Sequence, residues 1–166
     1  PETGHFALWL AAALAVAQLF GGWHFLRRSE HEAALRLLVP AAAAQGILCL
    51  IAFAALIWAF AVSDFSVALV ANNSHTAKPE LYKLTGAWAN HEGSMLLWVC
   101  VLAIFGAVAA LRVRALGARF RARLIQTMGA IGLGFYAYLL ISSNPFARLP
   151  NPPAEGAGLN PLLQDP

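Results

Sequence analysis

The sequence predicts an all-α, polytopic membrane protein, a helical bundle with four transmembrane helices in this segment. Three observations lead there: 60% of the 166 residues are hydrophobic and only 11% are charged, four long apolar runs divide the chain, and arginines gather in alternate connectors. A soluble domain carries about 45–50% apolar and about 25% charged residues, so this chain could not cover a water-facing surface. A mean hydropathy of +0.64 also excludes intrinsic disorder.

The apolar runs cover residues 4–26, 37–62, 94–111 and 124–141. Each is about as long as the roughly 20 residues that cross a hydrocarbon core. Run 37–62 contains Pro40, which we expect in the first turn of its helix, where proline is tolerated. Alanines and glycines in several runs predict closely packed helices.

The arginines predict the direction of the chain through the bilayer. Eight of the eleven basic residues lie in the first and third connectors: Arg27, Arg28, Arg36, Arg112, Arg114, Arg119, Arg121 and Arg123. The positive-inside rule assigns this side to the cytoplasm, so the N-terminus, connector 63–90 and tail 144–166 are expected outside. The net charge of +3 therefore reflects membrane topology, and we expect the lipid bilayer, not nucleic acid, as the partner.

Both outer segments have a distinctive composition. Connector 63–90 is long for a helical bundle, and after Pro79 it holds a short amphipathic stretch with Leu81, Leu84 and Trp88 on one face. Such a helix can lie along a membrane surface. Tail 144–166 holds six of the nine prolines and should be irregular, apart from a short turn near residues 159–163. It stops without a closing element, as expected of a piece of a longer protein.

The least ordinary residues stand where the third run begins. Trp88, His91, Met95 and Trp98 follow a 3, 4, 3 spacing, which predicts one helical stripe at the outer mouth of the bundle. Three hypotheses remain open. Glu92 and Ser94 cap the helix while His91 bonds to a neighbouring loop; or Trp88, His91 and Trp98 line a pocket for a flat aromatic ligand; or His91 binds a metal.

Neither a catalytic residue nor a metal site is predicted. His91 and Met95 would emerge on the same helical face, so they could not be the two axial ligands of one haem. The histidines contain no zinc spacing, and Cys49 and Cys100 form no C-x-x-C pair. We expect both cysteines to be buried, reduced and unpaired.

Motifs along the whole chain carry a resemblance to a known family. They are P-E-T-G-H-F-A-L at residues 1–8, V-A-N-N-S at 70–74, W-A-N-H-E-G-S-M-L-L-W at 88–98, S-S-N-P-F at 142–146 and N-P-L-L-Q-D-P at 160–166. With these motifs the chain resembles the N-terminal portion of the CcmF family, which includes NrfE and CycK. Proteins of this family are haem lyase subunits of bacterial cytochrome c maturation.

The resemblance implies covalent attachment of haem to apocytochrome c on the periplasmic side of the bacterial inner membrane. It implies haem b and a transferred haem as cofactors, with haem-ligating histidines downstream of Pro166. It also implies three kinds of partner: a CcmE-like haem chaperone, CcmH- and CcmI-like subunits that handle the apocytochrome, and apocytochrome c itself. The residues of the stripe, Trp88, His91 and Trp98, would then line a haem vestibule.

Other functions compete with this one. The segment could be a non-catalytic scaffold that docks partner maturation proteins, because it contains no nucleophile, thiol pair or ligand pair. It could belong to the paralogous subunit for nitrite reductase haem attachment. A transporter half is weaker still, because no centre of a predicted span carries a charged residue.

Overall fold

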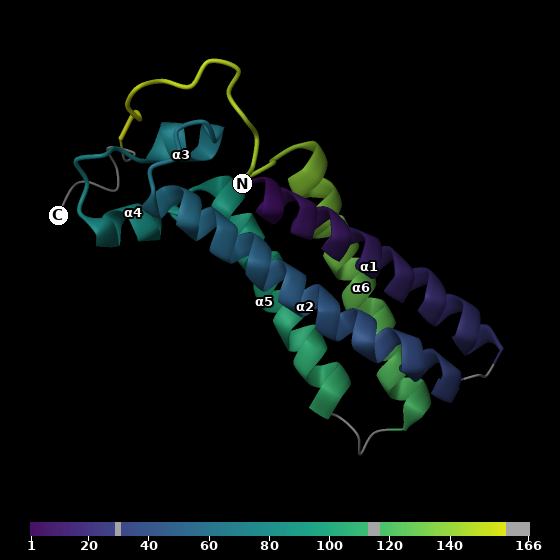
Figure 1. The fold of residues 1–166 in the computed structure, drawn as a ribbon. Coiled ribbons are helices and arrows are strands. Elements are labelled where there is room, and N and C mark those ends of the chain that lie inside the picture. Colours follow the sequence, from purple (N-terminus) through teal and green to yellow (C-terminus); the bar gives the residue numbers. More distant parts are fainter. Residues whose placement is uncertain (29–30, 113–116, 159–166) are drawn as a thin grey trace.

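The computed structural model describes residues 1–28, 31–112 and 117–158. Six helices form in this part of the chain: α1 (Glu2–Arg27), α2 (His31–Ala61), α3 (Ala68–Asn73), α4 (Glu80–Gly86), α5 (His91–Arg112) and α6 (Ala118–Ile141). Four of them, α1, α2, α5 and α6, are long and apolar enough to cross a membrane. These four run side by side in one elongated bundle, which confirms the predicted fold class (Figure 1).

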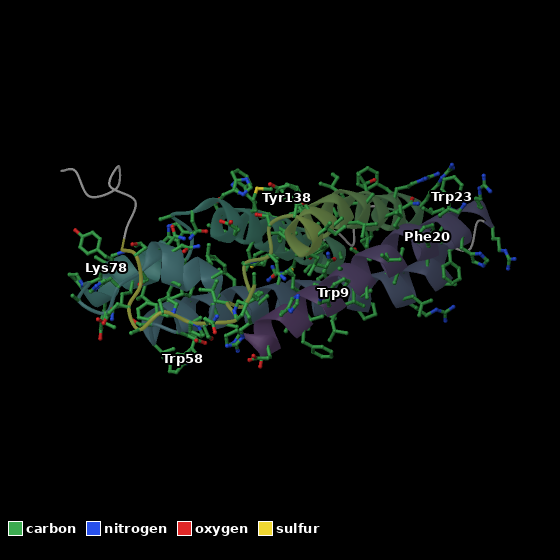
Figure 2. The ribbon with its side chains drawn as sticks, turned by 90° about the horizontal axis from the view of Figure 1, so that it is seen from above. Trp9, Phe20, Trp23, Trp58, Lys78 and Tyr138 are labelled. Atoms are coloured by element: carbon green, nitrogen blue, oxygen red, sulfur yellow. The ribbon has the colours of Figure 1, made fainter. Side chains whose placement is uncertain are left out.

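The two ends of the bundle differ in what they carry. The helix ends that flank the arginine-rich connectors lie together at one end, which we call the arginine end (Figure 1). At the other end, which we call the loop end, lie the N-terminus, α3, α4 and the tail after α6. Figure 2 shows Phe20 and Trp23 toward the arginine end, with Trp58 and Lys78 toward the loop end. The predicted grouping of connectors is therefore present in space.

Helix α2 is the most extensively packed helix of the bundle. It contacts α1, α5, α6 and α4, while α6 contacts α1, α2 and α5. Helices α1 and α5 thus flank a central pair. Their packing depends on small residues: a Cβ at Gly129 would lie 2.8 Å from the Cβ of Gln18, and one at Gly22 would lie 2.8 Å from the Cβ of Gln126. Helices α1 and α6 approach this closely because neither glycine carries a side chain.

The expectation for Pro40 was wrong. Helix α2 begins at His31, so Pro40 lies inside the helix instead of in its first turn. Proline lacks the N–H that would bond the carbonyl of Arg36. Both Arg36 and Pro40 are exposed, near the arginine end, where headgroups and water can satisfy that carbonyl. The helix therefore continues through the proline.

A chain of polar side chains crosses the interior of the bundle. The Gln18 amide donates to Gln45 Oε1 at 2.6 Å, and Gln45 Nε2 donates to the Tyr136 hydroxyl at 2.8 Å. That hydroxyl also lies 2.9 Å from Cys49 Sγ. These hydrogen bonds link α1, α2 and α6 and satisfy polar groups that are buried among apolar side chains. Cys49 and Cys100 are both buried and free, as predicted.

The tail after α6 is irregular through residue 158, as the prolines predict. It folds back over the loop end: Leu149 N–H donates to Ser66 O at 2.9 Å, and Ala68 N–H donates to Ala147 O at 2.8 Å. Farther along, the amides of Ala157 and Gly158 donate to carbonyls of the α3 segment. The turn expected near residues 159–163 lies outside the described residues.

Candidate functional site

The W-A-N-H-E-G-S motif forms a tight corner between α4 and α5. Asn90 Oδ1 accepts a hydrogen bond from Gly93 N–H at 2.7 Å, and Asn90 Nδ2 donates to Gly86 O at 2.7 Å. A Cβ at Gly93 would collide with the carbonyl oxygen of Ala87. The side chain that caps the helix is therefore Asn90, whereas the Ser94 hydroxyl donates to His91 O. Glu92 lies in the first turn, where its charge suits the helix dipole as the first hypothesis expected. Asparagine before a helix is a recognised N-cap signal, which the sequence analysis missed.

His91 is held between the corner and the segment that follows α6. Its Nδ1 lies 3.3 Å from Ser143 Oγ, and its ring packs edge-to-face on Tyr138 with centroids 5.8 Å apart. The His91 side chain is exposed, and its Nε2 takes part in no hydrogen bond among the described residues. The contact with Ser143 is the loop bond that the first hypothesis expected.

A groove of about 270 Å³ opens beside His91, between α5 and α6. It is lined by Met95, Ile131, Gly134, Phe135 and Tyr138. Its lining is almost entirely apolar, and a Cβ at Gly134 would meet no atom within 4 Å. The groove therefore has room for a flat or extended apolar group, with an imidazole and a phenol near its loop end.

Trp88 does not line the groove. Helix α5 begins at His91, so Trp88 lies in the turn before it, and its ring packs near Phe53 of α2 with centroids 6.4 Å apart. His91, Met95 and Trp98 keep their 4 and 3 spacing inside α5 and so share a helical face. The four-residue stripe is therefore a three-residue stripe, with Trp88 on the α2 side.

A second imidazole lies at the same end of the bundle. His5 Nε2 accepts a hydrogen bond from Trp9 Nε1 at 3.1 Å and lies 3.3 Å from Asn144 Nδ2. The ring of Phe146 fills the space above Gly4, where a Cβ would lie 2.6 Å from it. Nothing in the sequence connects His5 with Asn144, because the two residues are 139 positions apart.

Charged side chains fasten the tail to the loop end. Arg148 pairs with Glu2 and also donates to Ser66 Oγ. Glu155 accepts from the Thr76 hydroxyl at 2.6 Å and lies 3.6 Å from His75 Nε2. The Thr76 hydrogen bond, helped by the nearby His75, holds the pKa of Glu155 below its usual range.

We call His5, His91, Ser143, Asn144 and Phe146 the loop-end junction. Three motif segments that are far apart in the sequence meet there: the P-E-T-G-H start, the H-E-G-S corner and S-S-N-P-F. Within residues 1–28, 31–112 and 117–158, no three His, Cys, Asp or Glu side chains gather as a metal site would require. The junction offers hydrogen bonds and aromatic surfaces, which suit binding better than bond making.

Comparison with known proteins identifies the class. The family model described as "Cytochrome C assembly protein" matches residues 88–166, which include α5, α6 and the tail. Ccl1 of Rhodobacter capsulatus, a cytochrome c-type biogenesis protein, is 52% identical over 99% of this chain and 25% of its own length. CycK of Bradyrhizobium diazoefficiens is 45% identical with the same coverage.

A solved structure agrees. The chain matches one titled "Cytochrome c Heme Lyase CcmF" with a TM-score of 0.77 and 28% identity, over 90% of this chain and 25% of that one. With four helices that can cross a membrane, the protein is thus a multi-pass membrane protein, and its relatives carry names of cytochrome c-type biogenesis. It belongs to the CcmF family, and the chain spans about a quarter of the length of these relatives.

Proposed function

We propose that this chain is the N-terminal part of a CcmF-like haem lyase that attaches haem covalently to apocytochrome c. One observation carries the proposal furthest: three of the five motif segments, residues 1–8, 88–98 and 142–146, meet in the loop-end junction. Attachment would join the vinyl groups of haem to the two thiols of a C-x-x-C-H segment in the apocytochrome. The reacting thiols belong to that substrate, so the chain needs no nucleophile of its own.

The arginine pattern supports a cytoplasmic arginine end and a periplasmic loop end in the bacterial inner membrane. Cysteine labelling tests this. Ala77→Cys and Arg28→Cys place thiols at exposed positions of opposite ends, while Cys49 and Cys100 are buried. An impermeant maleimide added outside should label position 77 and leave position 28 unlabelled until the membrane is opened. The reverse pattern would overturn the proposed direction.

The cofactors we propose for the whole protein are a resident haem b and the haem that is transferred. The described residues do not fit a pair of axial ligands, because His91 and Met95 emerge from one face of α5 and Nδ1 of His91 faces Ser143. They fit a wall of a haem vestibule: His91 would present Nε2, and Trp98, with 65% of its surface exposed, would present an indole face. Trp88 would contribute only if the vestibule extended to the α2 side.

The partners we propose are a CcmE-like haem chaperone, CcmH- and CcmI-like subunits and apocytochrome c. Each would approach at the loop end, where the described structure departs from simple membrane helices. Residues 68–86 and 143–158 make this end broad and give it both polar and aromatic groups.

Substitution of His91 tests the site. In the full-length protein, His91→Ala should lower the yield of holocytochrome c in a haem stain while an immunoblot shows a normal amount of the variant. His24→Ala is the matched control, because His24 is an exposed imidazole near the arginine end. Trp98→Ala should act like His91→Ala, and Trp98→Phe should restore part of the yield. Normal haem staining in both alanine variants would refute the vestibule.

A non-catalytic scaffold is the second candidate. It is favoured because the described residues bring no thiol pair and no ligand pair together. Cys49 and Cys100 are free, and the described hydrogen bonds of the loop-end junction join parts of the fold to one another. In that case His91→Ala would leave haem staining unchanged, and loss of co-purifying maturation subunits would follow changes on α3 and α4 instead.

A further inference from the structure

The connector helix α4 exposes apolar side chains that nothing in the described chain covers. Leu81 is 68% exposed and Tyr82 is 53% exposed, and Trp88 in the following turn is 40% exposed. The helical path continues past Gly86, because the amides of Trp88 and Ala89 donate to Thr85 O at 3.2 and 3.1 Å. Leu81 and Trp88, seven residues apart on that path, therefore project from the same side.

The depth of this side in the membrane follows from α2. About 20 residues cross a hydrocarbon core of about 30 Å, so a span that starts at Leu37, after Arg36, leaves the core near Leu56. Phe53, which packs near the Trp88 ring, lies just inside that boundary. Phe60 lies just outside it, and a Cβ at Gly86 would be 2.9 Å from the Phe60 ring.

Helix α5 gives the same depth. Counting about 20 residues back from Leu111, at the arginine end, reaches Glu92, four residues after Trp88. Both spans therefore place Trp88 at the edge of the hydrocarbon core and α4 in the headgroup layer above it. Trp58, which is 68% exposed on α2 two residues beyond Leu56, lies at this same level.

The composition of α4 suits that layer. Tryptophan and tyrosine concentrate where a membrane meets water, because each ring has an apolar body and a polar tip. Lys83 lies beside them and can reach lipid phosphates, while Glu80 is exposed to water. In water, the large apolar surface of Leu81 would be unfavourable, and in the headgroup layer it is buried.

We propose that α4 and the turn through Trp88 form an interfacial anchor, which seats Leu81, Tyr82 and Trp88 among the lipids of the leaflet at the loop end. The occupant of this face is lipid, not another protein segment. The anchor fixes the height and tilt of the α4–α5 corner relative to the bilayer. It would do so whether or not the protein attaches haem.

Spin labelling tests the anchor in the full-length protein. In a background with Cys49→Ser and Cys100→Ala, labels are placed at Leu81→Cys and Tyr82→Cys and the protein is reconstituted in phospholipid nanodiscs. Asn151→Cys, exposed in the tail, is the water-facing reference. Collision rates are measured with oxygen, which partitions into lipid, and with a nickel chelate, which stays in water.

The expected result is a several-fold higher oxygen-to-nickel collision ratio at positions 81 and 82 than at position 151. Two outcomes would overturn the proposal. A ratio equal to that at position 151 would mean that α4 faces water. An immobilised spectrum with few collisions from either reagent would mean that a protein segment covers this face.

Discussion

Replacing Gln45 tests whether the interior polar chain holds the bundle together. Gln45 accepts from Gln18 at 2.6 Å and donates to Tyr136 at 2.8 Å, so Gln45→Leu removes two interhelical hydrogen bonds at nearly constant volume. Such bonds between membrane helices contribute about 0.6 kcal/mol on average and up to about 1.7 kcal/mol. Two of them predict a loss of about 1–3 kcal/mol in the free energy of unfolding.

The loss is measured by titrating the detergent-solubilised protein with sodium dodecyl sulfate and following tryptophan fluorescence. Tyr136→Phe, alone and combined with Gln45→Leu, completes a double-mutant cycle. We expect the two changes to be non-additive, because both remove the same bond. Leu50→Met, on the exposed face of α2, is the control and should change stability by less than about 0.5 kcal/mol. Additive effects, or a Gln45→Leu variant as stable as the parent, would refute the reasoning.

Three further predictions concern the loop end. Gly93→Ala should destabilise the protein by about 1–3 kcal/mol, because its Cβ would overlap a backbone carbonyl. Gly134→Ala, with open space at its Cβ, should be neutral or stabilising in the same unfolding assay. Asn90→Ala should cost about 1 kcal/mol as a lost N-cap, and Asn90→Asp should recover part of it; equal stability of all three forms would contradict the cap. The lowered pKa of Glu155 predicts that the tail stays docked above the usual carboxyl pKa of about 4.3 and is released as the pH falls through the lowered value. Amide exchange at residues 157 and 158 reports this release. Thr76→Ala should move the pH of release upward. Exchange that does not depend on pH, after correction for the intrinsic rate, would exclude the role of Glu155.

The bundle could be predicted from the sequence because its determinants are local. Length and hydropathy define each span, and eight arginines in two connectors define which helix ends lie together. The irregular tail follows equally directly from its prolines. None of these inferences needs to know which residue contacts which.

The contacts could not be predicted in the same way. Gln18, Gln45 and Tyr136 look unremarkable in their apolar runs, and only the packing of three helices joins them. Trp88 has helical spacing to His91, but the Asn90 cap starts the helix after it. Spacing shows which residues can share a face; it does not show where a helix begins.

The pairing of Arg148 with Glu2 has a consequence for the biosynthesis of the chain. Glu2 precedes the first span and Arg148 follows the fourth, so the two meet only after all four spans have been inserted. Until then residues 66–68, which lead into α3, lack their strand-like contact with residues 147–149. These contacts of the loop end therefore form only after the fourth span has been inserted, and protection of residues 66–74 from an added protease would mark the moment at which insertion of the four spans is finished.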